Sequence, residues 1–200
     1  LVIATLLGFS IEMKQAKVLT DKELKKVIDY VETQRHAERN RTMLLLTHYC
    51  GMRVSEIANL KKADVVNSNG EINDVIYLKA EQTKGSDSRR VFVNKKAKAL
   101  LKRYINADLS VIRSDHLFTT QKCKQFSPNS LTQLLKRLYE QVGIQNATSH
   151  SGRRTFITKL ANSGVGVRVI AELASHKSIQ TTQRYIDIND ELCSNAVELV

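Results

Sequence analysis

The chain has 200 residues, of which 42% are hydrophobic and 26% are charged. This length suffices for one ordinary domain with a hydrophobic core, and the composition excludes wholesale disorder. The 31 lysine and arginine residues outnumber the 20 acidic residues and give a formal net charge of +11. Such an excess favours a polyanionic partner, nucleic acid first and an anionic membrane second.

Secreted, membrane-spanning and disulfide-stapled classes are excluded by the sequence. Cys50, Cys123 and Cys193 are widely spaced and form no C-x-x-C pair, so neither a disulfide framework nor a zinc site is expected, and a reducing cytoplasm fits. No apolar run approaches the ~18 residues that span a bilayer. The apolar residues 1–9 lack a basic region and a cleavage site of small residues.

The first expected helix begins after a short linker. Residues 1–17 are predicted to be the stub of a linker from a longer protein, because the chain starts with leucine and not with methionine. Thr20 and Glu23 form a capping-box pattern, in which each side chain binds the backbone amide of the other residue. The apolar residues of one helical face follow at helical spacing: Leu24, Val27, Ile28 and Val31.

Two further helices and a small sheet are predicted next. The apolar residues 43–49 indicate a helix that ends at Gly51, a residue suited to the position after a helix end, and residues 55–60 indicate a short helix. The β-rich runs 75–78 and 90–93 flank a polar turn. These runs predict an antiparallel hairpin.

Helical spacing returns after the hairpin in Ala97, Leu100, Leu101, Tyr104 and Ile105. Ser127 and Pro128 are typical of an N-cap and a first helical position, and Gly143 marks the end of that helix. Residues 155–161 and 167–173 indicate two more helices. The predicted fold class is therefore mainly α with a small antiparallel β-sheet (α+β).

Two basic segments in the first half of the chain have the residues for anion binding. Arg53 and Glu56 are three residues apart, so one helical face carries both, and the carboxylate can hold the guanidinium for bidentate phosphate binding. Lys84 stands beside a glycine in the hairpin turn and can reach into a cleft. An ordinary surface ion pair and a solvated turn are the simpler explanations for these residues when each is taken alone.

Two more segments lie in the second half. His150 and Arg153 are three residues apart at a predicted helix N-terminus, where backbone amides already favour an anion. His176 and Tyr185 are nine residues apart, with a stretch rich in serine and threonine between them. A basic capped helix end is the simpler explanation for the first pair, and a packed tyrosine is the simpler explanation for the second.

Together and in this order, the four segments resemble the catalytic domain of the tyrosine recombinases, the phage-integrase-type site-specific recombinases. That pattern is an arginine in G-x-R-x-x-E, a hairpin lysine, an H-x-x-R box, a histidine in an L-G-H-like segment and a tyrosine nine residues later. Residues 18–200 carry the resemblance. It implies the catalytic-domain fold of this family and an enzyme that cleaves and rejoins DNA for integration or excision.

The sequence departs from the family pattern at two places. After the box histidine, Gly152 replaces the usual leucine and Arg154 replaces the usual histidine. Leu173-Ala-Ser-His176 lacks the glycine that usually precedes the histidine. Neither departure removes a residue with a direct role, so we expect activity to be retained.

The resemblance implies that Arg53, Arg153 and His176 stabilise negative charge on the phosphate oxygens in the transition state. Guanidinium groups offer forked donors that stay charged, and they do what metal ions do in many nucleases. No metal and no cofactor are implied.

The remaining implied roles concern proton transfer and attack. Tyr185 is the nucleophile, which forms a 3′-phosphotyrosine, and an electropositive pocket lowers the cost of forming its phenolate. Lys84 is the general acid for the leaving 5′ oxygen, His150 is the general base or proton relay, and Glu56 supports Arg53.

The resemblance also implies a domain organisation and partners. Residues 18–200 are the catalytic domain, and about 187–200 are a C-terminal exchange tail, for which packing on its own core is an equal alternative. Residues 1–17 follow an upstream core-binding domain. Double-stranded DNA, a homo-tetramer on paired sites and accessory DNA-bending proteins are the expected partners, without a membrane. The expected location is the cytoplasm, at the nucleoid, for a prokaryotic, phage or plasmid protein.

Three alternatives remain open at this point. A non-catalytic basic DNA-binding regulator explains the charge without chemistry. A type IB topoisomerase-like or hairpin-resolving relative uses the same transesterification for another purpose. A binder of anionic membranes ranks last, because no helix pairs a basic face with a broad apolar one.

Overall fold

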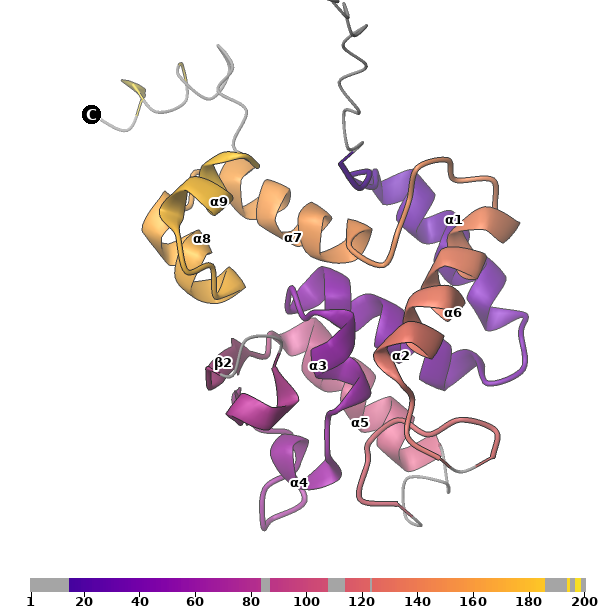
Figure 1. The fold of residues 1–200 in the computed structure, drawn as a ribbon. Helices are drawn as coiled ribbons and strands as arrows, with labels where there is room; N and C mark the ends of the chain where they lie inside the picture. Colours follow the sequence, from indigo (N-terminus) through magenta and orange to yellow (C-terminus); the bar gives the residue numbers. More distant parts are fainter. Residues whose placement is uncertain are drawn as a thin grey trace, which may run out of the picture.

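The structure, a computed structural model, describes residues 15–83, 87–107, 114–122, 124–185, 194, 197 and 198. The described helices and strands are, in chain order, α1 (Asp21–Glu32), α2 (Ala37–Tyr49), α3 (Val54–Ala58), α4 (Lys62–Val65), β1 (Val75–Leu78), the 3-10 helix η1 (Ala80–Gln82), β2 (Arg89–Phe92), α5 (Lys95–Ala107), α6 (Pro128–Gln141), α7 (Ser151–Asn162), α8 (Val167–Ala174) and α9 (Ile179–Gln183). Helix α7 leads from the side of α1 and α6 towards α8 and α9 (Figure 1). The predicted mainly helical fold with a small sheet is confirmed.

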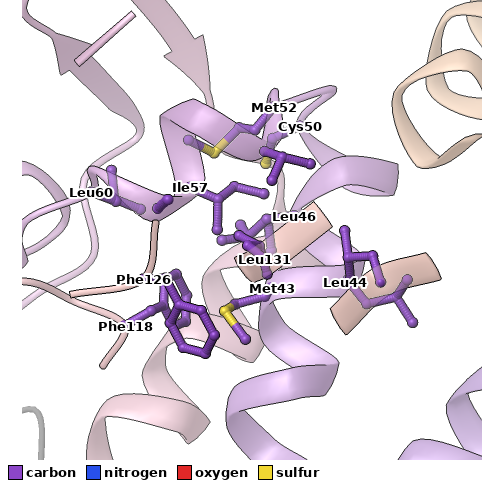
Figure 2. Packing of buried hydrophobic residues seen from close by; sticks show 14 of the residues in the cluster. Met43, Leu44, Leu46, Cys50, Met52, Ile57, Leu60, Phe118, Phe126 and Leu131 are labelled. Atoms are coloured by element: carbon purple, nitrogen blue, oxygen red, sulfur yellow. The ribbon is translucent and has the colours of Figure 1, made fainter. Parts of the chain in front are cut away.

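Helix α2 is the central helix of the main core. Residues 43–46 are all buried, and α2 packs against α1, α5 and α7. A helix with apolar residues on all its sides is buried on all sides. Figure 2 shows part of this main cluster, with Met43 and Leu46 of α2 among Ile57 and Leu131.

The small sheet consists of β1 and β2, which are antiparallel as predicted, with Val75 opposite Phe92, Ile76 opposite Val91, Tyr77 opposite Arg90 and Leu78 opposite Arg89. Side chains alternate between the core and the exposed face, because successive residues of a strand point to opposite faces. Val91 therefore lies in the core and Arg90 is exposed. Arg89, one residue before the predicted start of the strand, occupies a core-facing position.

The predicted helix caps are confirmed. The Thr20 side chain accepts from the backbone N–H of Glu23, and the Glu23 carboxylate accepts from that of Thr20. Ser127 caps α6 in front of its proline. Gly51 follows the end of α2 with a φ of 60°, a conformation in which glycine is favoured because it has no Cβ.

Other boundaries differ from the prediction. Helix α2 begins at Ala37 and not at residue 43, because its first turns are held by polar groups that leave no apolar pattern. Arg39 donates to the side chain of Asn40 and to the carbonyl of Thr119. Helices α4 and η1 were not predicted; each is a single short turn, too short to show a period.

Helix α7 approaches α2 very closely. A Cβ added to Gly152 would lie 1.8 Å from Thr47 Oγ1 of α2, so only glycine fits at this crossing. The replacement of the family's leucine by glycine thus has a packing reason. On its other side α7 forms a second, smaller apolar cluster with α8, made of Ile157, Ala161, Ile170 and Ala174.

Candidate active site

An open cleft of 1060 Å³ lies between the hairpin and the α8–α9 region. Arg53, Arg89 and Arg168 line it together with His176 and Lys177. Two exposed ion pairs connect its two sides, Arg90 with Glu172 and Lys177 with Asp87. Cationic side chains outnumber the acidic ones in the lining, so the cleft is suited to an anion.

Arg53 and Glu56 are arranged as the sequence predicts. Arg53 is the N-cap of α3, and both its backbone N–H and its Nη1 donate to the Glu56 carboxylate at 2.7 Å. The Glu56 side chain is fully buried, whereas that of Arg53 is 25% exposed. The carboxylate therefore fixes the guanidinium from the protein side, and the partly exposed Arg53 side chain lines the cleft.

Arg89 is a member of the site that the sequence analysis missed. Its Nη1 donates to Glu56, and its Nη2 donates to the carbonyl of Leu173 at 2.9 Å. Burial alone raises the pKa of the Glu56 carboxyl, but the charges of Arg89 and Arg53 hold this pKa below its ordinary value. Glu56 is thus a buried anion shared by two guanidinium groups.

Arg153 joins α7 to the residue that follows the C-cap of α2 and to the end of α8. Its Nη1 donates to the carbonyl of Gly51 at 2.5 Å, and its Nη2 donates to that of Ala174. Burial, followed by the charges of Arg53 and Arg89, lowers the pKa of Arg153. The group nevertheless remains a cation at pH 7, because its lowered pKa, about 9, still lies above 7.

The C-terminal turn of α8 is where the three arginines meet. Arg53 donates to the carbonyl of Ser175 at 3.1 Å, beside the bonds of Arg89 and Arg153 to the two preceding carbonyls. The last carbonyls of a helix lack partners within the helix and carry its negative dipole end. Guanidinium groups from β2, α3 and α7 therefore converge there in the described structure.

His176 directly follows this turn. Its Nδ1 lies 2.8 Å from the hydroxyl oxygen of Thr182, a fully buried residue of α9. Burial, followed by the charges of Arg153 and Arg53, lowers the pKa of His176 to about 4. The imidazole is therefore neutral at pH 7 and carries a single N–H.

Tyr185 lies at the end of α9, beside His176. The two rings are stacked, with 5.9 Å between their centroids. The Tyr185 ring also packs against the smaller apolar cluster and lies 5.7 Å from the guanidinium carbon of Arg154. The predicted pair of histidine and tyrosine is thus close in space.

Lys84 and His150 are the remaining predicted site residues. Lys84 lies outside the described residues. His150 is the N-cap of α7, one turn before Arg153, and its side chain is exposed.

Across the parts of the chain that the structure describes, there is no group of three or more His, Cys, Asp or Glu residues placed to hold a metal ion. No helix in those parts is both long and apolar enough to cross a membrane.

Fold and site together define a helical domain that gathers guanidinium groups, an imidazole and a phenol at one helix end. Residues 17–191 match the model of the phage integrase family. The chain belongs to this family, since the match covers most of its length.

Curated relatives agree with this assignment. Tyrosine recombinase XerA of Pyrococcus furiosus is 30% identical over 185 residues, which cover 91% of this chain and 61% of the relative. Tyrosine recombinase XerD of Oceanobacillus iheyensis is 30% identical over 183 residues, which cover 88% and 59%. The chain thus spans about three fifths of the length of these relatives.

Solved structures confirm the fold. The crystal structure of XerA recombinase has a TM-score of 0.73 at 26% identity, covering 92% of this chain and 64% of that one. The Tn1549 transposon integrase in complex with a circular intermediate DNA has a TM-score of 0.75 at 16% identity, covering 94% and 67%. At 16% identity the likeness shows the fold alone. The predicted resemblance to the tyrosine recombinases is therefore confirmed.

Proposed function

We propose that this chain is the catalytic domain of a site-specific DNA recombinase that cleaves and rejoins DNA through a 3′-phosphotyrosine. The observation that carries the proposal is the convergence of Arg53, Arg153 and His176 at the end of α8, with Tyr185 stacked on His176. Family membership supports the same chemistry.

The phosphate binds where the guanidinium groups meet. Each guanidinium has five N–H donors, so Arg53 and Arg153 retain donors for phosphate oxygens beside their bonds to protein oxygens. His176 is neutral, and when the Thr182 hydroxyl donates to its Nδ1, its Nε2–H is left to donate to the same phosphate. These donors stabilise the charge that develops on the non-bridging oxygens in the transition state.

The reaction consists of two balanced transesterifications. The Tyr185 oxygen forms a bond to phosphorus while the bond from phosphorus to the 5′ oxygen breaks. Lys84 protonates this leaving oxygen, and His150 accepts or relays the phenol proton. The 5′-hydroxyl of a partner strand then attacks phosphorus and releases Tyr185. Glu56 keeps Arg53 in place throughout.

The organisation predicted from the sequence belongs to this proposal. Residues 1–17 link the domain to an upstream core-binding domain, and residues 187–200 form the exchanged tail of a tetramer on two double-stranded DNA sites. Accessory DNA-bending proteins are further partners, and the prokaryotic nucleoid is the location. The net charge of +11 supports binding to DNA phosphates, so affinity falls steeply with salt.

A covalent-trapping assay tests the function. The full chain and its Tyr185→Phe variant are incubated in EDTA with nicked duplexes from the source replicon and quenched with SDS. We expect a DNA–protein adduct from the unmutated chain only. The same adduct from Tyr185→Phe would exclude Tyr185 as the nucleophile.

Two further outcomes separate the alternatives. DNA binding by both proteins without an adduct from either one would favour the non-catalytic regulator. Relaxation of a supercoiled plasmid without recombination between two labelled sites would favour the topoisomerase-like relative.

A further inference from the structure

Arg154 connects two parts of the molecule that are far apart in the sequence. Its Nη1 donates to the carbonyl of Ala16 at 2.9 Å, in the segment that precedes α1. Its guanidinium carbon lies 5.7 Å from the centre of the Tyr185 ring. Its Nε is buried and has no hydrogen-bond partner among the residues that the structure describes. The side chain is therefore held between a backbone carbonyl and the tyrosine ring.

Residues 15–20, the leading segment, are attached firmly along α7. The backbone N–H of Leu19 donates to the Thr155 hydroxyl at 2.9 Å, and Thr155 in turn donates to the carbonyl of Ser151. One turn further along α7, Lys159 forms an ion pair with Asp21 at the start of α1. The Ala16 carbonyl thus belongs to an ordered segment and gives Arg154 a fixed acceptor.

Tyr185, in contrast, has little regular structure to hold it. It follows α9, a helix of five residues, and its backbone N–H donates to the carbonyl of Thr182 at 3.0 Å. Helices this short are not stable without side-chain packing. The direction of the phenol therefore depends on what contacts its ring, which is the imidazole of His176, the smaller apolar cluster and Arg154.

We propose that Arg154 is a positioning residue for the nucleophile Tyr185 and that it couples the leading segment to this ring. The inference rests on the proposed function. A guanidinium near an aromatic face attracts it, and one fixed by a backbone carbonyl holds the ring in one place. The family pattern has histidine at position 154, so a permanently charged contact at this position is a property of this chain.

The test separates positioning from DNA binding. Arg154→Gln keeps a donor but removes the charge, whereas Arg154→Lys keeps the charge. Single-turnover cleavage is measured with the full chain at saturating nicked DNA, together with the DNA Kd. We expect Arg154→Gln to slow cleavage by about 2- to 30-fold, the range for a contact of this kind, with an unchanged Kd, and Arg154→Lys to restore most of the rate. Arg137→Gln, the same change on the exposed side of α6, is the matched control and leaves the rate unchanged.

Two results would overturn the proposal. Cleavage by Arg154→Gln at the unmutated rate would show that Arg154 does not position Tyr185, while the proposed function stands. A rate loss that is fully explained by a weaker Kd, or that is not rescued by lysine, would assign Arg154 to DNA binding or to folding. If the unmutated chain forms no adduct with any duplex, the proposed function itself fails.

The coupling has its own test. Thr155→Val is nearly isosteric and removes the bond that holds Leu19, without touching Tyr185. We expect it to slow cleavage when Arg154 is present and to have no further effect in the Arg154→Gln background. Additive effects on the cleavage rate would show that the leading segment and the tyrosine are not coupled through Arg154.

Discussion

The main body, α1 to α6 with the small sheet, and the C-terminal part, α7 to α9, are stabilised in different ways. The body packs a large apolar cluster around α2, whereas the C-terminal part buries four apolar residues of its own, namely Ile157, Ala161, Ile170 and Ala174. Since apolar burial contributes about 25 cal/mol per Å², most of the packing free energy belongs to the body.

The site lies across the boundary between these two regions. Arg53, Glu56 and Arg89 come from the body, and His176 and Tyr185 come from the C-terminal part. The regions are joined at the site by bonds from guanidinium groups to the carbonyls at the end of α8. The body therefore supplies stability, and polar bonds supply the geometry of the site.

The largest expected effect is the loss of the buried anion. Glu56→Gln leaves Arg89 buried without its counter-charge, and breaking a buried pair in this way lowers the free energy of unfolding by about 3–5 kcal/mol. Glu172→Gln is the matched control, because its partner Arg90 and Glu172 itself are more than half exposed, and it changes stability by less than about 1 kcal/mol. Urea unfolding measures both variants. Similar losses in the two would contradict the role of Glu56 as the shared anion.

A pair of cavity variants compares the two regions directly. Leu46→Ala in the body lowers the free energy of global unfolding by about 2–5 kcal/mol. Ile170→Ala makes its cavity in the smaller cluster, so we expect a smaller global loss and faster amide hydrogen exchange in α8. Urea unfolding and hydrogen exchange of residues 167–174 are the measurements. Unchanged exchange in α8 would show that the two regions open only together.

Acid should weaken the fold through two histidines whose pKa is lowered by burial. Burial lowers the pKa of His48 from 6.5 to about 3, and that of His176 to about 4. Between pH 6.5 and pH 4 the unfolded chain binds protons that the folded chain does not, so stability is lost as the pH falls. For His48 this loss is on the order of 3 kcal/mol.

The slope of stability against pH distinguishes the two histidines. Urea unfolding from pH 7.5 to pH 4 measures the slope of stability against pH. His48→Gln should remove a large part of this slope. His176→Gln should remove a smaller part, because His176 is only half-buried. An unchanged slope in His48→Gln would show that carboxyl groups cause the acid sensitivity.

Local signals and the order of motifs along the chain account for what the sequence could predict. The capping box at Thr20 and the serine–proline start of α6 are complete within a few residues, and both are observed. The order and spacing of basic motifs identified Arg53, Arg153 and His176, which the fold brings together. The two caps need no knowledge of distant parts of the chain, whereas the basic motifs are informative only through their order and spacing along it.

Arg89 could not be found in this way. It stands beside Arg90 in β2, and only the register of the strand decides which of the two points into the core. Arginine is usually exposed, and the partner that makes burial possible, Glu56, is 33 residues away. The one available signal was alternation along the strand, which places residue 89 on the same face as Val91.

The smallest expected effect concerns the turn on which the arginines converge. Ser175 ends α8 with a φ of 47°, in the left-handed region, at the position where the family pattern has glycine. A residue with a Cβ loses about 1 kcal/mol there relative to glycine, so Ser175→Gly should raise the free energy of unfolding by about that amount. Ser175→Ala keeps the Cβ and serves as the control, without this gain.

Arg53 binds the carbonyl and not the side chain of Ser175, so cleavage by Ser175→Gly should stay within about twofold of the unmutated rate. If Ser175→Gly were less stable or cleaved much more slowly, the serine side chain would be holding the turn, and the backbone alone would not explain how the three guanidinium groups are placed.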